Sequence, residues 1–166
     1  MRWLSFYRSS PDASSGPTYT QASFGYVVQT QDGAEGVVDI GMRSEFATLR
    51  EAIAAQALER LVAQCGDQAD VALDGLHFAP TITDPKKILC VGLNYKAHQE
   101  ETGRGGEGVP TVFVRFAAAQ MGHGEPMVRP RESASLDFEG EIAMITGRGG
   151  RRIARKDAMD HVVGFG

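Results

Sequence analysis

The sequence predicts an α+β fold in two parts, a small α+β domain over residues 1–80 and a strand-rich domain over residues 81–166. Three observations support this prediction. Short apolar segments with alternating polarity recur along the chain, and one strongly amphipathic helix stands in the first part. The segment HFAPTITDPKK, at residues 77–87, carries two prolines between the two parts. Many of the 20 glycines lie in the second half, which indicates short strands joined by turns.

Composition excludes several classes of protein. The chain has 166 residues, of which 42% are hydrophobic and 23% charged, typical of a globular protein with one sizeable core or two small ones. A net charge of −4 gives no basic surface for nucleic acid or an anionic membrane. No apolar run approaches the roughly 20 residues that span a bilayer. Cys65 and Cys90 are expected to be free thiols in a reducing cytoplasm.

The first part begins with strands. RWLSFYR, at residues 2–8, alternates apolar and polar side chains and predicts a strand. A hairpin follows, with SFGYVVQT at 23–30 and EGVVDI at 35–40 as its arms. Asp32 and Gly33 stand between the arms, and this pair suits the positive φ that tight hairpin turns require.

A single helix is predicted to follow the hairpin. Thr48 and Glu51 have the spacing of a capping box, and Gly66 supplies a C′ stop. Apolar side chains recur at every fourth position between them, at Leu49, Ile53, Ala57, Leu61 and Cys65. Residues 1–80 show no pattern typical of a catalytic site.

The second part alternates predicted strands with helical turns. Its strands are expected at residues 87–93, 110–116, 137–147 and 162–166. A short helix is predicted to be capped by Asn94 and to end at Gly103. A second helical turn is expected over residues 155–162.

Two carboxylates stand two positions apart in the strand predicted at 137–147. Side chains at i and i+2 face the same way on a strand, so Glu139 and Glu141 would project side by side with Cβ atoms about 6–7 Å apart. Such oxygens are ligands for hard cations such as Mg²⁺, Mn²⁺ or Ca²⁺. The alternative is an edge strand with a solvated acidic face, and the spacing alone favours that alternative.

A histidine and a glutamate share one face of the predicted helix. His98 and Glu101 are i, i+3 neighbours, so the carboxylate can orient the imidazole and raise its basicity. A histidine held in this way serves as a general base. A surface pair of no consequence is the alternative, and these two residues alone favour it.

Two further motifs have both a functional and a purely structural interpretation, and the structural one is favoured for each. GRGGRRIARK, at residues 147–156, is compatible with an RNA-contacting or phosphate-binding loop. The acidic chain and the lack of interleaved aromatic residues favour a solvated turn instead. His123, in GHGE, invites a metal-binding interpretation, but a lone histidine in a glycine loop is more often simply exposed.

Taken in order, four segments resemble the fumarylacetoacetate hydrolase family. They are KILCVGLNYKAHQEE, PTVFVRF, LDFEGEIAMITG and RRIARKDAMDHVVGFG. The second departs from the family pattern, with Arg115 and Phe116 where a lysine and a proline are usual. The resemblance covers roughly residues 86–166, and residues 1–80 resemble the leading domain of bacterial members less specifically. Within the family, the sequence is similar to the 2-hydroxyhepta-2,4-diene-1,7-dioate isomerase and 2-keto-4-pentenoate hydratase kind.

The resemblance implies a mixed β-roll, of which residues 81–166 would form the first portion. It implies that Glu139 and Glu141 bind Mg²⁺, or else Mn²⁺ or Ca²⁺, and that the enzyme is a homodimer. It implies His98 and Glu101 as the general-base pair. It also implies substrate contacts from Tyr95 and Arg115. The substrates would be small oxo-acids of the acylpyruvate or 2-oxo-4-enoate type, in aromatic-compound catabolism.

The third metal ligand of the family is an aspartate just after the position that matches VVGFG, where this sequence ends. The expectation is therefore a truncated catalytic domain. One hypothesis is a hydrolase, hydratase, isomerase or decarboxylase that acts through a metal-stabilised enolate, since the same metal and base serve all four reactions. The alternative is a non-catalytic, dimerising remnant of the fold. No nucleic-acid or membrane partner is expected.

Overall fold

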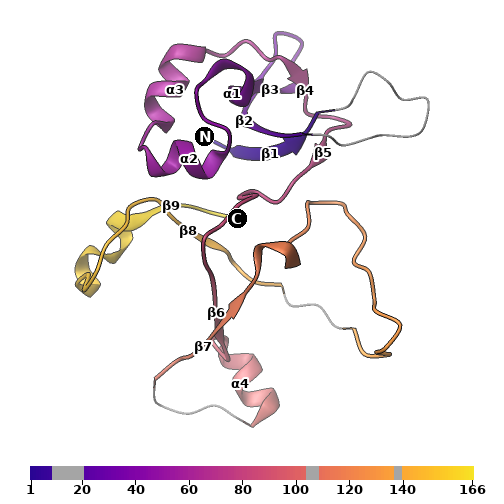
Figure 1. Ribbon diagram of the computed structural model, residues 1–166, viewed down its shortest axis with the longest axis vertical. Helices are drawn as coiled ribbons and strands as arrows, with labels where there is room; N and C mark the ends of the chain where they lie inside the picture. Colours follow the sequence, from indigo (N-terminus) through magenta and orange to yellow (C-terminus); the bar gives the residue numbers. More distant parts are fainter. Residues whose placement is uncertain (9–20, 104–108, 137–139) are drawn as a thin grey trace. The chain divides into compact units, whose positions relative to one another are not determined.

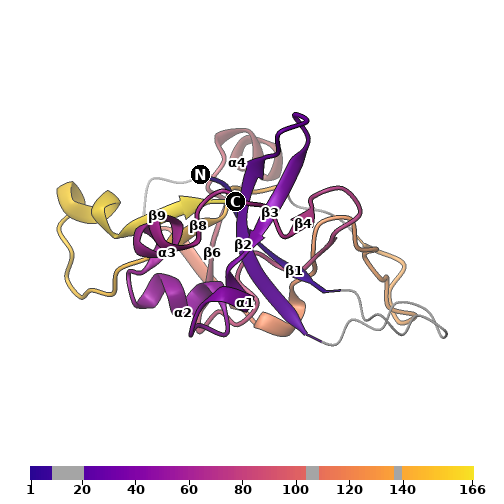
Figure 2. The same ribbon diagram turned by 90° about the horizontal axis from the view of Figure 1, so that it is seen from above.

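A computed structural model describes residues 1–8, 21–103, 109–136 and 140–166 (Figures 1 and 2). The chain divides into two compact units. Unit 1 comprises residues 1–83 and 121–166, and unit 2 comprises residues 84–120. The structure is mixed α+β, which confirms the predicted fold class. The domain boundary between residues 80 and 81 stays a prediction.

Unit 1 is built on a five-stranded antiparallel sheet with the order β4-β3-β2-β1-β5. Its strands are β1 (Trp3–Tyr7), β2 (Ala22–Gln29), β3 (Glu35–Asp39), β4 (Val71–Ala72) and β5 (His77–Phe78). The predicted first strand and hairpin are confirmed. Gly33 has φ of 83° and donates its N–H to the Thr30 carbonyl at 3.0 Å, as the turn requires.

Three short helices contribute to the main core of unit 1. They are α1 (Ile40–Arg43), α2 (Leu49–Ala54) and α3 (Leu58–Cys65). Their apolar residues pack against the side chains that β2 and β3 direct to the same face. The buried residues of this core, from strands and helices together, are Phe24, Tyr26, Val38, Ile40, Leu49, Ala52, Ile53, Ala57 and Leu61. A smaller cluster of Leu4, Phe6 and Val37 forms separately, because side chains alternate along a strand.

The single helix predicted from Thr48 to Gly66 is wrong, because the structure has two helices there. Gln56 adopts φ of 53° and interrupts the helical path between α2 and α3. At about 100° per residue, Leu49 and Cys65 would lie about 160° apart around an unbroken helix. The break resets the phase, so both side chains pack against the same core cluster. The predicted N-cap at Thr48 and the helix stop at Gly66, which has a positive φ of 68°, are confirmed.

Unit 2 is a two-stranded antiparallel sheet with one helix. β6 (Ile88–Gly92) pairs with β7 (Thr111–Arg115), and α4 (Lys96–Thr102) lies between them in the sequence. A 3₁₀ turn covers Ala117–Ala119. Apolar side chains of the sheet are exposed, among them Leu89, Val112, Phe113 and Val114. An isolated two-stranded sheet of this kind is only marginally stable.

The predicted cap at Asn94 is wrong, because the N-cap of α4 is Tyr95. Leu93 has φ of 54°, and the chain therefore turns before Asn94 and enters the helix one residue later. The Gln99 side chain donates to the Leu93 carbonyl and fastens that turn. The predicted end is confirmed, since Gly103 is left-handed with φ of 63°.

The last part of unit 1 is a second, separate hairpin. β8 (Met144–Thr146) pairs with β9 (Val162–Phe165), and a 3₁₀ helix covers Arg155–His161. These elements confirm the predicted helical turn and the final strand. The strand predicted at 137–147 is shorter, because residues 140–143 have no regular secondary structure. Residues 137–139 lie outside the described residues.

A buried carboxylate joins several elements of unit 1. Asp39 is 1% exposed, and its oxygens accept from Arg8 Nε at 2.8 Å and from an Arg8 terminal nitrogen at 2.9 Å. Ser23 donates to the same carboxylate, as does the Met42 backbone N–H at the start of α1. The hydrogen bond to Asp39 raises the pKa of Arg8. Arg8 therefore remains charged beside the buried carboxylate, which it contacts through two hydrogen bonds.

The buried helix-sheet core also encloses one phenol. Tyr26 donates its O–H to the Gly66 carbonyl, and burial raises the pKa of Tyr26.

The described residues include no helix that is both long and apolar enough to cross a membrane.

We expect Asp39→Ala to lower the free energy of unfolding of unit 1 by about 3 kcal/mol, because it leaves Arg8 without its partner in a partly buried site and removes the cap of α1. Denaturant titration followed by the fluorescence of Trp3, the single tryptophan, measures this. Arg2→Ala is the matched control, since the Arg2–Glu35 ion pair is 60% and 41% exposed at its side chains. The control should cost less than about 1 kcal/mol. Equal losses in the two variants would contradict the assignment.

Candidate functional site

All four residues predicted to act on substrate lie in unit 2. His98 and Glu101 are on α4, with 3.8 Å between His98 Nδ1 and Glu101 Oε2. The two side chains are 48% and 82% exposed. At this distance the pair is longer than a hydrogen bond, and both side chains have room to rotate. The structure thus places the predicted base and its carboxylate on one face of the helix, where both are exposed to solvent.

Tyr95 stands at the entrance to the same helix. It is 46% exposed and three positions before His98, so the two residues are neighbours on the helix surface. The left-handed turn at Leu93 and the Gln99 hydrogen bond set where α4 starts. The positions of Tyr95 and His98 therefore depend on that turn.

Arg115 lies at the other end of the β6–β7 hairpin. It pairs with Ile88, whereas α4 follows Gly92 at the opposite end of β6. These two ends are about 13 Å apart along the strand, at about 3.4 Å per residue. The Arg115 guanidinium donates to the Ala119 carbonyl at 3.4 Å. The strand register therefore separates Arg115 from His98, and its role in substrate binding stays a prediction.

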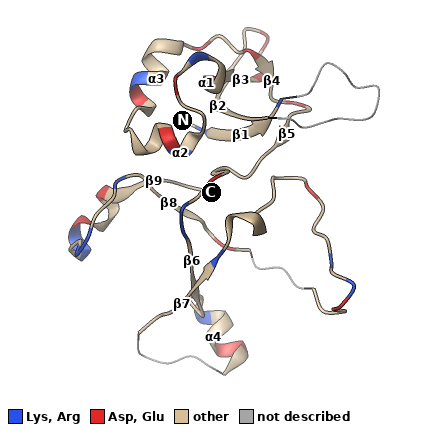
Figure 3. Cartoon of the chain, in the orientation of Figure 1, with Lys and Arg blue, Asp and Glu red and all other residues tan. Residues whose placement is uncertain are grey.

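The structure describes one of the two predicted metal ligands. Glu141 is exposed in the extended segment before β8, and Glu139 lies outside the described residues. The described part of the chain contains no group of three histidine, cysteine, aspartate or glutamate side chains placed to hold a metal ion. Figure 3 shows acidic and basic residues interspersed along the chain. Cation binding by Glu139 and Glu141 therefore stays a prediction.

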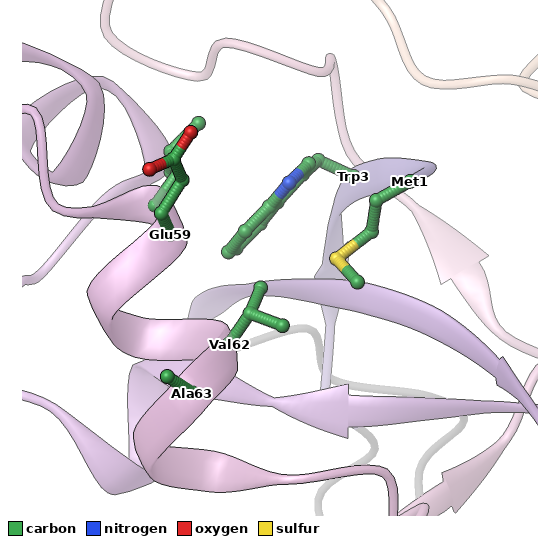
Figure 4. Close-up of a pocket in the computed structure, with 6 residues that line it drawn as sticks. Met1, Trp3, Glu59, Val62 and Ala63 are labelled. Carbon is green, nitrogen blue, oxygen red and sulfur yellow. The ribbon is translucent and has the colours of Figure 1, made fainter.

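Two cavities lie in unit 1. The first, of about 350 Å³, is mostly apolar and is lined by Met1, Trp3, Leu58, Glu59, Val62 and Ala63 (Figure 4). The one ionisable side chain among these lining residues is the Glu59 carboxylate, which does not suit an oxo-acid. The second, of about 410 Å³, is more polar, with Gln56, Glu59, Arg148, Asp160 and His161 in its wall. Neither wall includes any of the predicted site residues.

Residues 87–166 match the model of the family described as "Fumarylacetoacetate (FAA) hydrolase C-terminal". This segment is therefore similar to the C-terminal domain of fumarylacetoacetate hydrolases. The finding confirms the family resemblance expected for residues 86–166, whereas the isomerase or hydratase subtype stays a prediction.

Two proteins similar to this segment carry a different name from that subtype. "Oxaloacetate tautomerase fahd2, mitochondrial" of Xenopus laevis is 42% identical over 84 residues, which cover 51% of this chain and 26% of that protein. "Oxaloacetate tautomerase YisK" of Bacillus subtilis is 40% identical over 93 residues, which cover 54% of this chain and 31% of that protein. The matches thus span less than a third of each relative.

A solved structure agrees with the fold over nearly the whole chain. The fumarylacetoacetate hydrolase from psychrophilic Exiguobacterium antarcticum superposes with a TM-score of 0.64 at 26% sequence identity. The superposition covers 99% of this chain and 53% of that one. The likeness includes the N-terminal α+β part, which precedes the segment matched by the family model.

A second histidine–glutamate pair was missed by sequence reasoning. His77 Nε2 and Glu125 Oε1 are 2.9 Å apart, closer than His98 and Glu101. Glu125 lies in the segment that matches the family model, and His77 precedes that segment. The partners are 48 positions apart, so no spacing rule indicates them. His123, in the same loop, is exposed, as the sequence indicated. Its ring forms a T-shaped contact with the ring of Phe78, with the centroids 5.7 Å apart.

Glu125 is held in its charged form. Its Oε2 accepts the Gly122 N–H at 2.7 Å, and this bond, followed by the one to His77, lowers the pKa of Glu125 below its ordinary 4.5. A carboxylate that accepts two hydrogen bonds is stabilised relative to its protonated form.

We expect this carboxylate to make stability depend on acidity. Because the folded pKa of Glu125 is lowered, its contribution is complete above the unfolded value of 4.5 and is lost as the pH falls through the folded pKa. Thermal unfolding of the wild-type protein and of Glu125→Gln, measured from pH 7 into this acidic range, tests the sign. The difference in midpoint should be largest near pH 7 and shrink toward low pH. A constant difference would contradict this origin.

Proposed function

We propose that the chain takes part in proton-transfer chemistry on small oxo-acids, and that keto–enol tautomerisation of oxaloacetate is its reaction. The observation that carries the proposal is the similarity of the family domain to proteins named oxaloacetate tautomerases, at 42% and 40% identity. The exposed pair of His98 and Glu101 supports it, because the reaction needs a base and the residue that steadies it.

Tautomerisation moves a proton from the carbon beside a carbonyl to the carbonyl oxygen. In the proposed step, neutral His98 takes the proton from carbon, and the Glu101 carboxylate stabilises the imidazolium that forms. The two side chains must approach from 3.8 Å to about 2.8 Å for a charge-assisted hydrogen bond, which their exposure permits. The same imidazolium then returns the proton to oxygen.

Tyr95 and Arg115 have separate proposed roles. The Tyr95 hydroxyl, next to His98 on the helix surface, would donate to the developing enolate oxygen. Arg115 would bind a substrate carboxylate, since its guanidinium forms a planar fork of donors. The distance along the hairpin places that contact away from the reacting carbon.

A divalent cation is a separate part of the proposal. The described residues bring no three donors together, so no proton-transfer step above is assigned to a cation. Glu139 and Glu141 are proposed to bind Mg²⁺, with Mn²⁺ or Ca²⁺ as substitutes, because carboxylate oxygens suit hard cations. A homodimer in the cytoplasm is likewise proposed.

C–C bond hydrolysis of acylpyruvates is the second candidate function. The structural likeness to a protein named fumarylacetoacetate hydrolase favours it, and the same base would activate water. The wider expectation of aromatic-compound catabolism belongs with this candidate. A non-catalytic dimerising module remains the alternative from another class.

Enol consumption by the wild-type protein, monitored by ultraviolet absorbance of oxaloacetate, tests the first function. We expect His98→Ala to lower kcat/KM by about 10²- to 10⁴-fold, because the general base is removed. Glu101→Gln should lower it by about tenfold, while His123→Ala is the matched control and should leave it unchanged. A His98→Ala variant as active as the wild type would overturn the assigned base. A folded wild-type sample inactive on oxaloacetate and acylpyruvates would favour the non-catalytic module.

Isothermal titration with MgCl₂ and MnCl₂ tests the cation. The wild-type protein should bind one ion, and Glu139→Ala and Glu141→Ala should each abolish the signal because hard cations need both oxygens. Glu132→Ala, an exposed carboxylate in the same part of the chain, serves as the control. Binding that survives in both ligand variants would show that the ion sits elsewhere.

A further inference from the structure

Strand β5 receives the chain where it comes back from unit 2. The polypeptide leaves unit 1 after Thr83 and re-enters it at Met121. The next residue, Gly122, is buried against β5, and a Cβ added there would lie 1.8 Å from the Phe78 carbonyl oxygen. Only glycine permits so close an approach, so the return point is fixed to one place on the sheet.

Glu125 completes the attachment. Its two carboxylate oxygens bond His77 Nε2 at 2.9 Å and the Gly122 N–H at 2.7 Å. The His77 and Glu125 side chains are only 31% and 28% exposed, which protects the bonds from competing water. We name this arrangement of His77, Phe78, Gly122 and Glu125 the β5 clasp. It holds together two points of the chain between which the whole of unit 2 is inserted.

We propose that the β5 clasp is thermodynamically coupled to the pairing of β6 with β7. While those strands are paired, the connecting chain between the hairpin and the clasp consists of residues 79–87 and 116–121. Without pairing, closing the clasp must close all of residues 79–121, a loop roughly three times longer. Closure probability falls with about the 3/2 power of loop length, which gives a factor of about five.

The coupling acts in both directions. If strand pairing favours the closed clasp about fivefold, then the closed clasp favours strand pairing by the same factor. The two-stranded sheet of unit 2 is marginal on its own, so a factor of this size matters for it. Unit 2 carries Tyr95, His98, Glu101 and Arg115. His77 and Glu125 are therefore positioning residues for that segment, whether or not the proposed oxo-acid function is correct.

Native-state hydrogen exchange measures the coupling without any assay of activity. We expect His77→Ala and Glu125→Ala to speed exchange of the β6–β7 backbone amides about fivefold, because opening the clasp raises the unpaired fraction. His77→Gln keeps a side-chain N–H donor and should stay near the wild-type rate. Glu132→Ala, a carboxylate deletion outside the clasp, is the matched control and should change nothing.

Two further sets of amides decide the outcome. The Gly122 amide should be protected in the wild-type protein and lose protection in both alanine variants, and the β2–β3 amides should be accelerated less than the β6–β7 amides. Unchanged β6–β7 exchange in variants that release Gly122 would overturn the coupling. An unprotected Gly122 amide in the wild-type protein would overturn the clasp itself. Equal acceleration in β2–β3 would show general destabilisation and also overturn the proposal.

Discussion

The structure of unit 1 depends on one buried charge, the carboxylate of Asp39. It lies where β3 ends and α1 begins, and its partners come from the end of β1, from β2 and from the first turn of α1. Such a charge is stable only if every lone pair is occupied and a cation is held beside it. Arg8 supplies the cation and two of the hydrogen bonds, and Ser23 and the Met42 N–H supply the others. Gly41 makes the arrangement possible, since a Cβ there would lie 2.3 Å from Ser23 Oγ.

The segment that matches the family model does not coincide with a compact unit. It comprises residues 87–166, begins inside unit 2 and continues into unit 1. The side chains proposed to move protons are all in unit 2, while Glu141 and the β8–β9 hairpin belong to unit 1. The large buried core, by contrast, is formed chiefly by residues that precede the family segment. The residues with proposed chemical roles and the residues of the main buried core thus lie in different stretches of sequence.

Sequence patterns predicted those turns and caps whose geometry depends on residues close together in the chain. The Asp32-Gly33 turn, the Thr48 cap and the glycine stop at Gly103 depend on neighbouring residues, and each is present. Two-residue strands such as β4 and β5 form only because longer strands offer free edges, so no periodicity marks them. The break at Gln56 follows from tertiary packing of both helices on one core. The His77–Glu125 pair joins distant segments, and the site residues around His98 were indicated by family resemblance rather than by spacing.

The unequal distribution of a few side chains has a practical consequence. Trp3, at the edge of Tyr26 with ring centroids 5.1 Å apart, is an optical reporter that belongs to unit 1 alone. The free thiols are divided, with Cys65 on α3 and Cys90 on β6. Because both thiols are partly accessible, their labelling kinetics follow each unit separately, whereas tryptophan emission follows only one. A melting curve recorded by tryptophan fluorescence would therefore not report the unfolding of unit 2, whereas the rate of Cys90 alkylation would report it.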